Sequence, residues 1–408
     1  MSKKALSGVK VIELGDFVSA PWCGKLMADL GAEVIKVEQP SVGDSARHYG
    51  PFLGDIPHPE RSGLFLYLNA NKHGVTLDVT KTTGRRILLQ LLEQADVLIE
   101  SSLPSRMAEL ELDYAAISSV NPRLVVTSIT PYGQTGPYSD YKAFDINICA
   151  MGGLGVQHGT SDREPIRPPL NQAHYQSGLA AATATMFALL GRDVTGEGQH
   201  VDVSEADVLA TVHSYGGNIQ SYVFEGRVRK RSGHRARSYY PWTILPCKDG
   251  YISMMAVQGF QWKRFLEIVG GGELPEWYTN DPRFTDRMAI GRRYADEMDA
   301  LLAPWLMAHT KLEIFEMCQA QSVPFTPVKS ADELVNDDHL RERGFFVEID
   351  REDTGPLTYP GAPYQFSVTP WAIRRPAPFL GEHNAEIYRG RLGLSAEELR
   401  DLRLGGII

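Results

Sequence analysis

His174 is the residue whose type and position could most directly do chemistry, and it lies in the segment NQAHYQSG ahead of a long Ala-rich stretch. An imidazole can act as a general base or accept an acyl group. It can equally be a packed, hydrogen-bonded pocket residue, because a catalytic role needs a partner within reach. The sequence leaves both interpretations open and favours the second.

A basic loop is the second candidate. Residues 227–237, RVRKRSGHRAR, hold six Lys or Arg side chains and one His, and the loop runs into the aromatic segment SYYPW. One interpretation is a solvated loop, which is the usual place of a charge run. The other is a loop that faces a phosphate or a carboxylated substrate. The residues that would then meet the anion are Arg235, Arg237, Tyr239 and Tyr240.

Alternating strands and helices must position these residues. We expect a βαβ unit at the start, with a buried strand at 9–14, a helix at 21–30 begun by a proline and a second strand at 33–38. Such alternation predicts a parallel sheet with helices on both faces. The first turn, GDFVSAPW, lacks GxGxxG, which disfavours dinucleotide binding. The pattern continues with strands at 74–79, 96–100, 124–129 and 200–203 and with helices at 83–94, 178–192 and 204–224.

The character of the chain changes after the basic loop. A strand at 251–256 and helices at 261–269, 293–309 and 311–321 predict a smaller α/β domain. The tail holds the short candidate strands PFTPV, FFVEI and YQFSV, a Pro-rich run expected to wrap another surface in extended form, and a last helix at 395–402. We therefore predict a large Rossmann-like domain from residues 1–224, a small domain from 225–325, and a return to the large domain from 326–408.

Composition excludes several classes of protein. The chain has 408 residues and a net charge of -9, which argues against nucleic acid as a partner. The four cysteines lie far apart without a CxxC pair, so free thiols are expected and neither a metal site nor a disulfide framework is predicted. No apolar run suggests a membrane span or a signal peptide, and the expected location is the cytoplasm.

Ten segments occur in an order that carries a family resemblance. They resemble the family III CoA-transferases, which include formyl-CoA and carnitine CoA-transferases and alpha-methylacyl-CoA racemase. The resemblance implies a large Rossmann-like domain, a small domain and an interlocked dimer of two threaded chains. The segments are LSGVKVIELG, APW, LGAEVIKVEQP, NANKHGVTLDV, ADVLIE, NPRLVVTSITPYGQTGP, GRDVTGEGQHVDVS, VPFTPVKSADEL, HLRERGFFVEI and FLGEHNAEIY.

The same resemblance implies a covalent mechanism that His174 cannot perform. In the family an aspartate attacks the acyl-CoA and then holds CoA as a thioester, and the position of that aspartate, four residues before Gly178, is occupied here by His174. An imidazole has no carbonyl carbon with which to form a thioester. The racemase branch places a proton-transferring histidine where this chain has Phe144. No catalytic residue of either branch is therefore expected, and Asp145 is interpreted as structural.

The implied CoA contacts are only partly kept. The resemblance implies CoA contacts at Val18, Ala20, Lys72 and Lys142, and ordinary surface lysines are the alternative for the last two. Transferases of the family show ENFxPG followed by a basic residue and a glycine, where this chain reads ESSLPSRMAELEL and places Glu109 near the usual arginine. A glutamate beside a phosphate repels it. The departures are Ser101, Ser102, Ser105 and Glu111.

These patterns yield three hypotheses. The first is a non-catalytic subunit of a heteromeric CoA-transferase, whose aspartate comes from a paralogous chain. Its substrates would be an acyl-CoA such as succinyl-CoA and a carboxylic acid such as (R)-benzylsuccinate, with the CoA thioester as substrate and no covalently bound cofactor. The second is a self-sufficient CoA-thioester isomerase or lyase that uses His174 as base. The third is a binding protein without turnover.

Overall fold

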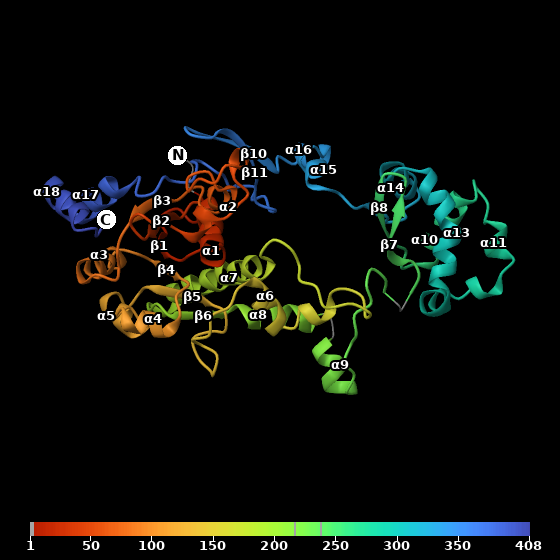
Figure 1. Ribbon diagram of the computed structural model, residues 1–408, viewed down its shortest axis with the longest axis horizontal. Helices are drawn as coiled ribbons and strands as arrows, with labels where there is room; N and C mark the ends of the chain where they lie inside the picture. Colours follow the sequence, from red (N-terminus) through yellow and green to blue (C-terminus); the bar gives the residue numbers. More distant parts are fainter. Residues whose placement is uncertain (1–3, 216–217, 237–238) are drawn as a thin grey trace. The chain divides into compact units, whose positions relative to one another are not determined.

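The computed structural model describes residues 4–215, 218–236 and 239–408. The chain forms two compact units, and Figure 1 follows them from one terminus to the other. The first unit comprises Met1–Gly155, Arg167–Arg227 and His339–Ile408, and the second comprises Val156–Ile166 and Val228–Asp338. The expected division into domains stays a prediction, with boundaries at 1–224, 225–325 and 326–408.

A six-stranded sheet forms the centre of the first unit. Its strand order is β3-β2-β1-β4-β5-β6, and every neighbouring pair is parallel. Most of its residues are buried, as expected for a parallel sheet covered on both faces. The predicted parallel α/β sheet is confirmed. The strands are β1 (Lys10–Leu14), β2 (Glu33–Glu38), β3 (His73–Thr76), β4 (Val97–Glu100), β5 (Val125–Thr130) and β6 (His200–Ser204).

Helices cover both faces of this sheet. Successive strand residues point to opposite faces, so Val11 packs with α1 and α7 while Ile12 packs with α3 and α5. The helices of the first unit are α1 (Ser19–Asp29), α2 (Gly63–Leu68), α3 (Thr82–Leu92), α4 (Pro104–Glu109), α5 (Tyr114–Val120), α6 (Asp145–Met151), α7 (Gln172–Thr195), α8 (Glu205–Tyr215), α9 (Asn218–Glu225), α17 (Asn384–Leu392) and α18 (Ala396–Leu404).

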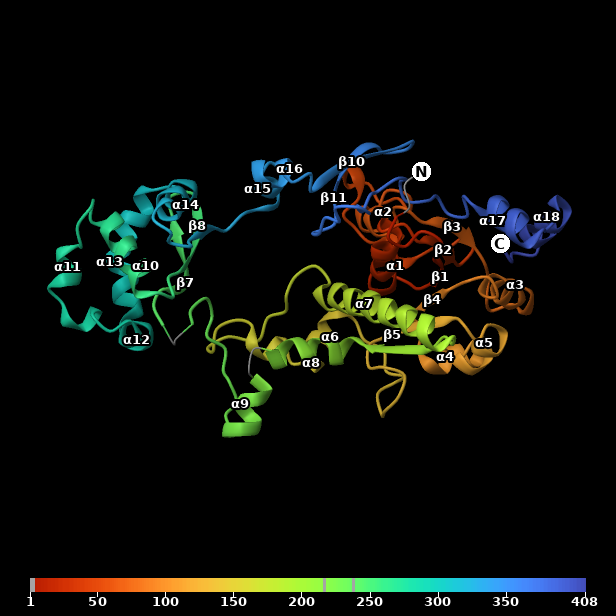
Figure 2. The ribbon, with the colours of Figure 1, turned by 180° about the vertical axis from the view of Figure 1, so that it is seen from behind.

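The end of the chain completes the first core. Figures 1 and 2 show α17 and α18 beside α3, and Ile387 and Tyr388 are buried in the same cluster as Ile87. The hydroxyl of Tyr388 donates to the carbonyl oxygen of Thr76 at 2.8 Å, and the backbone N–H of Thr76 donates to Asn384 Oδ1 at 2.8 Å. The tail also carries an antiparallel pair, β10 (Phe346–Arg351) and β11 (Gly355–Pro360).

The second unit has its own core around a three-stranded antiparallel sheet. Trp262 and Phe265 of α10 are buried there with Leu302 of α13. Its strands are β7 (Trp242–Cys247), β8 (Gly250–Met255) and β9 (Thr326–Pro327). Its helices are α10 (Gly259–Val269), α11 (Glu276–Thr279), α12 (Arg287–Ala289), α13 (Ala295–Ala308), α14 (Lys311–Ala320) and α15 (Ala331–Val335), and α16 (Asp338–Glu342) lies at the junction with the tail.

One expectation about secondary structure was wrong. The segment YQFSV at 364–368 forms no strand and has no neighbouring strand that pairs with it. The described residues of the helix expected at 204–224 lie in α8 and α9, apart from Ser204 at the end of β6, and residues 216–217 lie outside the described part. The four cysteines are free, as predicted, and all four are buried. No helix among the described residues is long and apolar enough to cross a membrane.

Candidate active site

A cavity of about 390 Å³ lies in the first unit at the carboxyl ends of the central strands. Residues that follow β1, β4 and β5 meet there, because the carboxyl ends of parallel strands share one edge of a sheet. The first turn of α7 and the first residue of α8 close the cavity with His174 and Glu205. The lining residues are Asp16, Phe17, Val18, Ser19, Ser45, Tyr49, Ser101, Ile129, Pro131, Ala143, Phe144, His174 and Glu205.

His174 and Glu205 form a hydrogen-bonded pair within this cavity. His174 Nδ1 lies 2.9 Å from Glu205 Oε1, and the two side chains are 11% and 3% exposed. Burial alone would lower the pKa of His174, but the hydrogen bond and the charge of Glu205, with a smaller effect of Asp145, raise it above 6.5. Nδ1 therefore carries a proton that it donates to Glu205, and Nε2 has no protein partner within the described ranges.

The sequence did not indicate Glu205 as a site residue and predicted only that a helix begins at residue 204. That part was right, because Ser204 Oγ accepts a hydrogen bond from the backbone N–H of Asp207 at 3.2 Å. The available signal was the position of Glu205 two residues after the strand predicted at 200–203. Such a residue lies at the same sheet edge as the other strand ends, where His174 had to be.

Asp145 holds the start of α7 in place. The residue before this helix, Asn171, has a left-handed backbone (φ 55°) and makes no side-chain cap. Asp145 Oδ1 accepts the backbone N–H of Ala173 at 2.9 Å instead, which satisfies one of the free donors at a helix start. Arg167 lies 3.5 Å from Asp145 Oδ2. The side chain of the neighbouring Phe144 is 77% exposed and lines the cavity.

The loop after β1 is fixed by hydrogen bonds to two other loops. Ser45 donates to Asp16 from its backbone N–H at 2.8 Å and from its hydroxyl at 2.7 Å. The backbone N–H of Asp16 donates to Ser101 Oγ at 3.0 Å. Burial, reinforced by the charge of Asp44, raises the pKa of Asp16. Of the two predicted CoA contacts here, Val18 lines the cavity, whereas Ala20 is buried in the core cluster under α1.

The two predicted lysines lie in opposite surroundings. The Lys72 ammonium is fully buried and lies 2.7 Å from Glu13 Oε2, 2.8 Å from the carbonyl oxygen of Pro21 and 2.9 Å from Asn69 Oδ1. These contacts use all three of its donors, and burial lowers the pKa of Lys72 to about 8. No donor of Lys72 remains for a phosphate. Lys142 is exposed on the loop before α6.

Residues 228–236 of the basic loop lie in the second unit, where Arg235 is paired with two carboxylates. Arg235 forms ion pairs with Asp296 and Asp299, and the Tyr240 hydroxyl donates to Asp299 Oδ1 at 2.6 Å. The Tyr239 hydroxyl accepts from Arg287 at 2.9 Å. Arg235 also borders a cavity of about 580 Å³. The predicted Arg237 lies outside the described residues, and anion binding by this loop stays a prediction.

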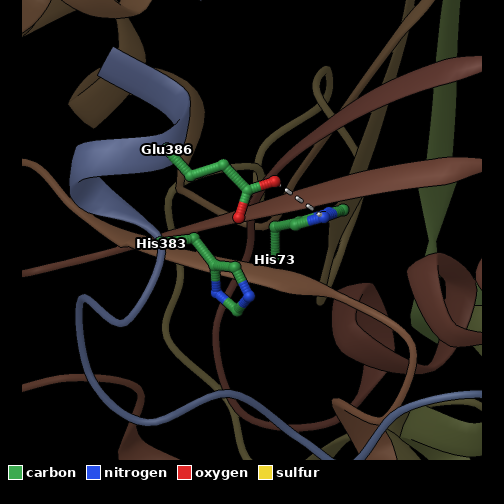
Figure 3. A group of neighbouring side chains, drawn as sticks. All are labelled: His73, His383 and Glu386. Atoms are coloured by element: carbon green, nitrogen blue, oxygen red, sulfur yellow. Dashed lines mark ion pairs between the residues drawn. The ribbon is translucent and has the colours of Figure 1, made fainter. Parts of the chain in front are cut away.

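A second histidine cluster joins the tail to β3. Figure 3 shows His73, His383 and Glu386 facing one another, and His73 Nε2 lies 3.7 Å from Glu386 Oε1. Arg375 donates to His73 Nε2 at 2.6 Å, and the backbone N–H of Gly74 donates to His383 Nδ1 at 3.1 Å. A neutral imidazole has one nitrogen lone pair. The lone pairs of His73 and His383 are therefore both occupied by hydrogen bonds, and we assign the two histidines and Glu386 to fixing the tail against β3.

The fold and the cavity at the strand ends define a class of protein. The chain belongs to CoA-transferase family III, whose model matches residues 6–384. It is accordingly an enzyme that transfers CoA, with CoA thioesters as substrates.

Relatives with known names agree with this class. The chain is 34% identical over 400 residues to succinyl-CoA:(R)-benzylsuccinate CoA-transferase subunit BbsE of Thauera aromatica, covering 95% of this chain and 94% of that protein. It is 30% identical over 388 residues to succinate--glutarate CoA-transferase of Agrobacterium fabrum, covering 94% and 95%. The crystal structure of a CAIB/BAIF family protein from Brucella suis matches with a TM-score of 0.85 at 29% identity, covering 95% and 100%.

Proposed function

We propose that this chain is the subunit of a heteromeric CoA-transferase that lacks the nucleophilic aspartate, and that a paralogous chain supplies it. In this proposal CoA passes from an acyl-CoA such as succinyl-CoA to a carboxylic acid such as (R)-benzylsuccinate, and the two chains are interlocked. The observation that carries the proposal is His174, which the family resemblance puts at the aspartate position and which is hydrogen-bonded to Glu205. A histidine side chain cannot hold CoA as a thioester.

The surroundings of His174 support the proposal. Glu205 is 3% exposed and its Oε1 lies 2.9 Å from His174 Nδ1, so this carboxylate is already engaged and is not a free nucleophile in place of the missing aspartate. Phe144 offers no proton-transferring group. Two relatives, the BbsE protein and the beta subunit of a succinyl-CoA--L-malate CoA-transferase from Chloroflexus aurantiacus, carry the word subunit in their names.

Reconstitution tests the proposal. The chain is purified alone, and again after coexpression with an aspartate-bearing paralogue. Each preparation receives succinyl-CoA and (R)-benzylsuccinate, and the new CoA thioester is measured by liquid chromatography. We expect product only from the coexpressed pair. A hydroxylamine-sensitive CoA adduct should form on the paralogue and not on this chain, and an adduct on this chain would overturn the subunit role.

A self-sufficient CoA-thioester isomerase or lyase is the second candidate, and the His174–Glu205 pair favours it. A carboxylate that fixes one imidazole nitrogen while the other faces a cavity is the arrangement of many general bases. Under this function the isolated chain should exchange the α-proton of an acyl-CoA with deuterium from D₂O. The exchange should fall at least about 100-fold in the His174→Gln variant, in line with the usual contribution of a general base. Absence of exchange in the isolated wild type would eliminate this candidate.

A further inference from the structure

A separate cavity of about 520 Å³ lies at the amino ends of strands of the main sheet. Glu33 and His73, the first residues of β2 and β3, line it, so it lies at the amino ends of strands. The cavity with His174 lies at the carboxyl ends of strands in the same sheet. The two cavities share no lining residue.

Three cations line this second cavity without a carboxylate partner. Lys4, Arg374 and Arg375 contribute to its wall, and none of them forms an ion pair with any carboxylate in the described part of the chain. Two acidic groups nearby are already paired, Glu33 with Arg391 and Asp29 with Lys25. Glu386 lies 3.7 Å from His73. Three cations without an ion-pair partner therefore share this hollow, with the charge of Asp29 acting on Arg374.

The paired arginines are held by a buried residue. Asn71 is 6% exposed, and its Oδ1 accepts the backbone N–H groups of Arg374 at 2.6 Å and Arg375 at 3.3 Å. Its Nδ2 donates to Asp29 Oδ1 at 2.6 Å and to the carbonyl oxygen of Ala372 at 2.8 Å. Asn71 therefore clamps the tail segment in a fixed position. The two successive guanidinium groups are brought together at the cavity despite their repulsion.

The side chains keep donors available. Arg374 uses one Nη2 donor for the carbonyl oxygen of Ala28 at 2.8 Å, and Arg375 uses Nη1 for His73. Lys4 donates to the carbonyl oxygen of Pro370 at 3.2 Å. A guanidinium group has five N–H donors and an ammonium group has three, so each side chain retains several. Burial lowers the pKa of Arg374, the charge of Asp29 partly opposes this shift, and the charge of Arg375 adds to it.

We propose that this cavity binds a small phosphate-bearing anion. Phosphate oxygens suit the forked donors of arginine, and a lysine ammonium adds a point charge. The volume exceeds that of one phosphate group and leaves room for an organic part. Binding would join the tail at Arg374–Arg375 to the chain start at Lys4. The proposal does not rest on the function proposed above, because the site lies at the other edge of the sheet.

Isothermal titration of the full chain tests the site. The probes are inorganic phosphate, pyrophosphate and AMP, with ionic strength held constant by sodium chloride, since screening alone changes such affinities. We expect saturable binding that weakens roughly tenfold or more in Lys4→Gln and in Arg374→Gln, from the loss of a charge-assisted hydrogen bond. A preference for AMP would indicate a nucleotide, and a preference for pyrophosphate would indicate a ligand bound through phosphates alone.

Arg86→Gln is the matched control, because Arg86 is exposed on α3 and absent from the cavity wall. It removes the same charge and should leave the affinity unchanged. The proposal fails if no probe gives saturable binding, or if Arg86→Gln weakens binding as much as Arg374→Gln. Lys4→Gln keeps the test valid if Arg374→Gln disturbs the tail, because Lys4 contacts only one tail carbonyl.

Discussion

The most direct test of the His174–Glu205 pair is Glu205→Gln. The substitution keeps the size of the side chain and removes its charge. Both groups are nearly buried and 2.9 Å apart, so the variant loses a charge-assisted hydrogen bond. Such bonds contribute about 1.5–3 kcal/mol. Histidine can avoid part of this cost by releasing its proton, so we expect a loss within that range and not the larger loss seen for a stranded buried charge.

The loss of stability in Glu205→Gln should depend on pH in a definite direction. The pKa of His174 is raised above 6.5 in the folded state, so the folded protein binds the proton more tightly than the unfolded chain. The stability from this pair is fully present below pH 6.5 and is lost as pH rises through the folded-state pKa. Glu205→Gln should therefore cost most near pH 6 and little near pH 9, because only the charged imidazole needs the carboxylate.

Hydrogen exchange of the α7 amide groups measures the local free energy of opening, and an NMR titration of His174 measures its pKa directly. His174→Gln identifies the His174 signal. Asp207→Asn is the control, because Asp207 is exposed on the same helix and carries the same charge. An unchanged pKa of His174 in Glu205→Gln, or an equal loss of stability at both pH values, would refute the ionised pair.

Three further predictions concern stability. Lys72→Met should lower the free energy of unfolding by about 3–5 kcal/mol, measured with urea, because Glu13 then loses one of its two buried cations. The control Lys142→Met, at an exposed position, should change it by no more than about 0.5 kcal/mol, and equal effects of the two variants would contradict the burial of Lys72. Burial, with the charges of Arg375 and His383, lowers the pKa of His73 below 6.5, so the wild type should lose stability as the pH falls from 7 through that pKa. The melting temperature of His73→Gln should fall less steeply over the same pH range, and an identical pH dependence of the two proteins would contradict the lowered pKa. Gly178→Ala should lower the melting temperature, through about 1–3 kcal/mol of overpacking, because the new Cβ would lie 2.5 Å from the carbonyl oxygen of Ser19. The control Gly390→Ala lies in open space on α17 and should raise the melting temperature. An unchanged melting temperature of Gly178→Ala would contradict the close packing of α1 on α7.

Local pattern predicted the main sheet because its strands are short apolar runs between turns. Each of the six expected strands overlaps a strand of the structure. The segment 364–368 has the same composition without a pairing partner, and strand formation depends on that partner. Helix α1 begins at Ser19, two residues before the proline used to predict its start. Such shifts at element ends are ordinary.

The site was harder to predict, because its key contacts join distant segments. His174 was expected ahead of the long helix at 178–192, whereas α7 begins at Gln172 and holds His174 in its first turn. Its partner is 31 residues away and is brought close by the register of β6. Lys72 was expected to contact CoA or to be an ordinary surface lysine, because lysine is rarely buried. Its burial depends on Glu13, which lies in β1. Pairing between remote charges leaves no periodic signal in the sequence.

The contribution of α17 to the first core has a consequence for synthesis. Thr76 in β3 and Asn384 are separated by about 300 residues, and at about 5–20 residues per second a ribosome needs roughly 15–60 s to make that length. During this interval the face of the nascent sheet that later receives Ile387 and Tyr388 remains incompletely covered. Ribosome-bound chains that end before residue 384 should accordingly attract chaperones that recognise apolar surface, and release of the full chain should end that interaction.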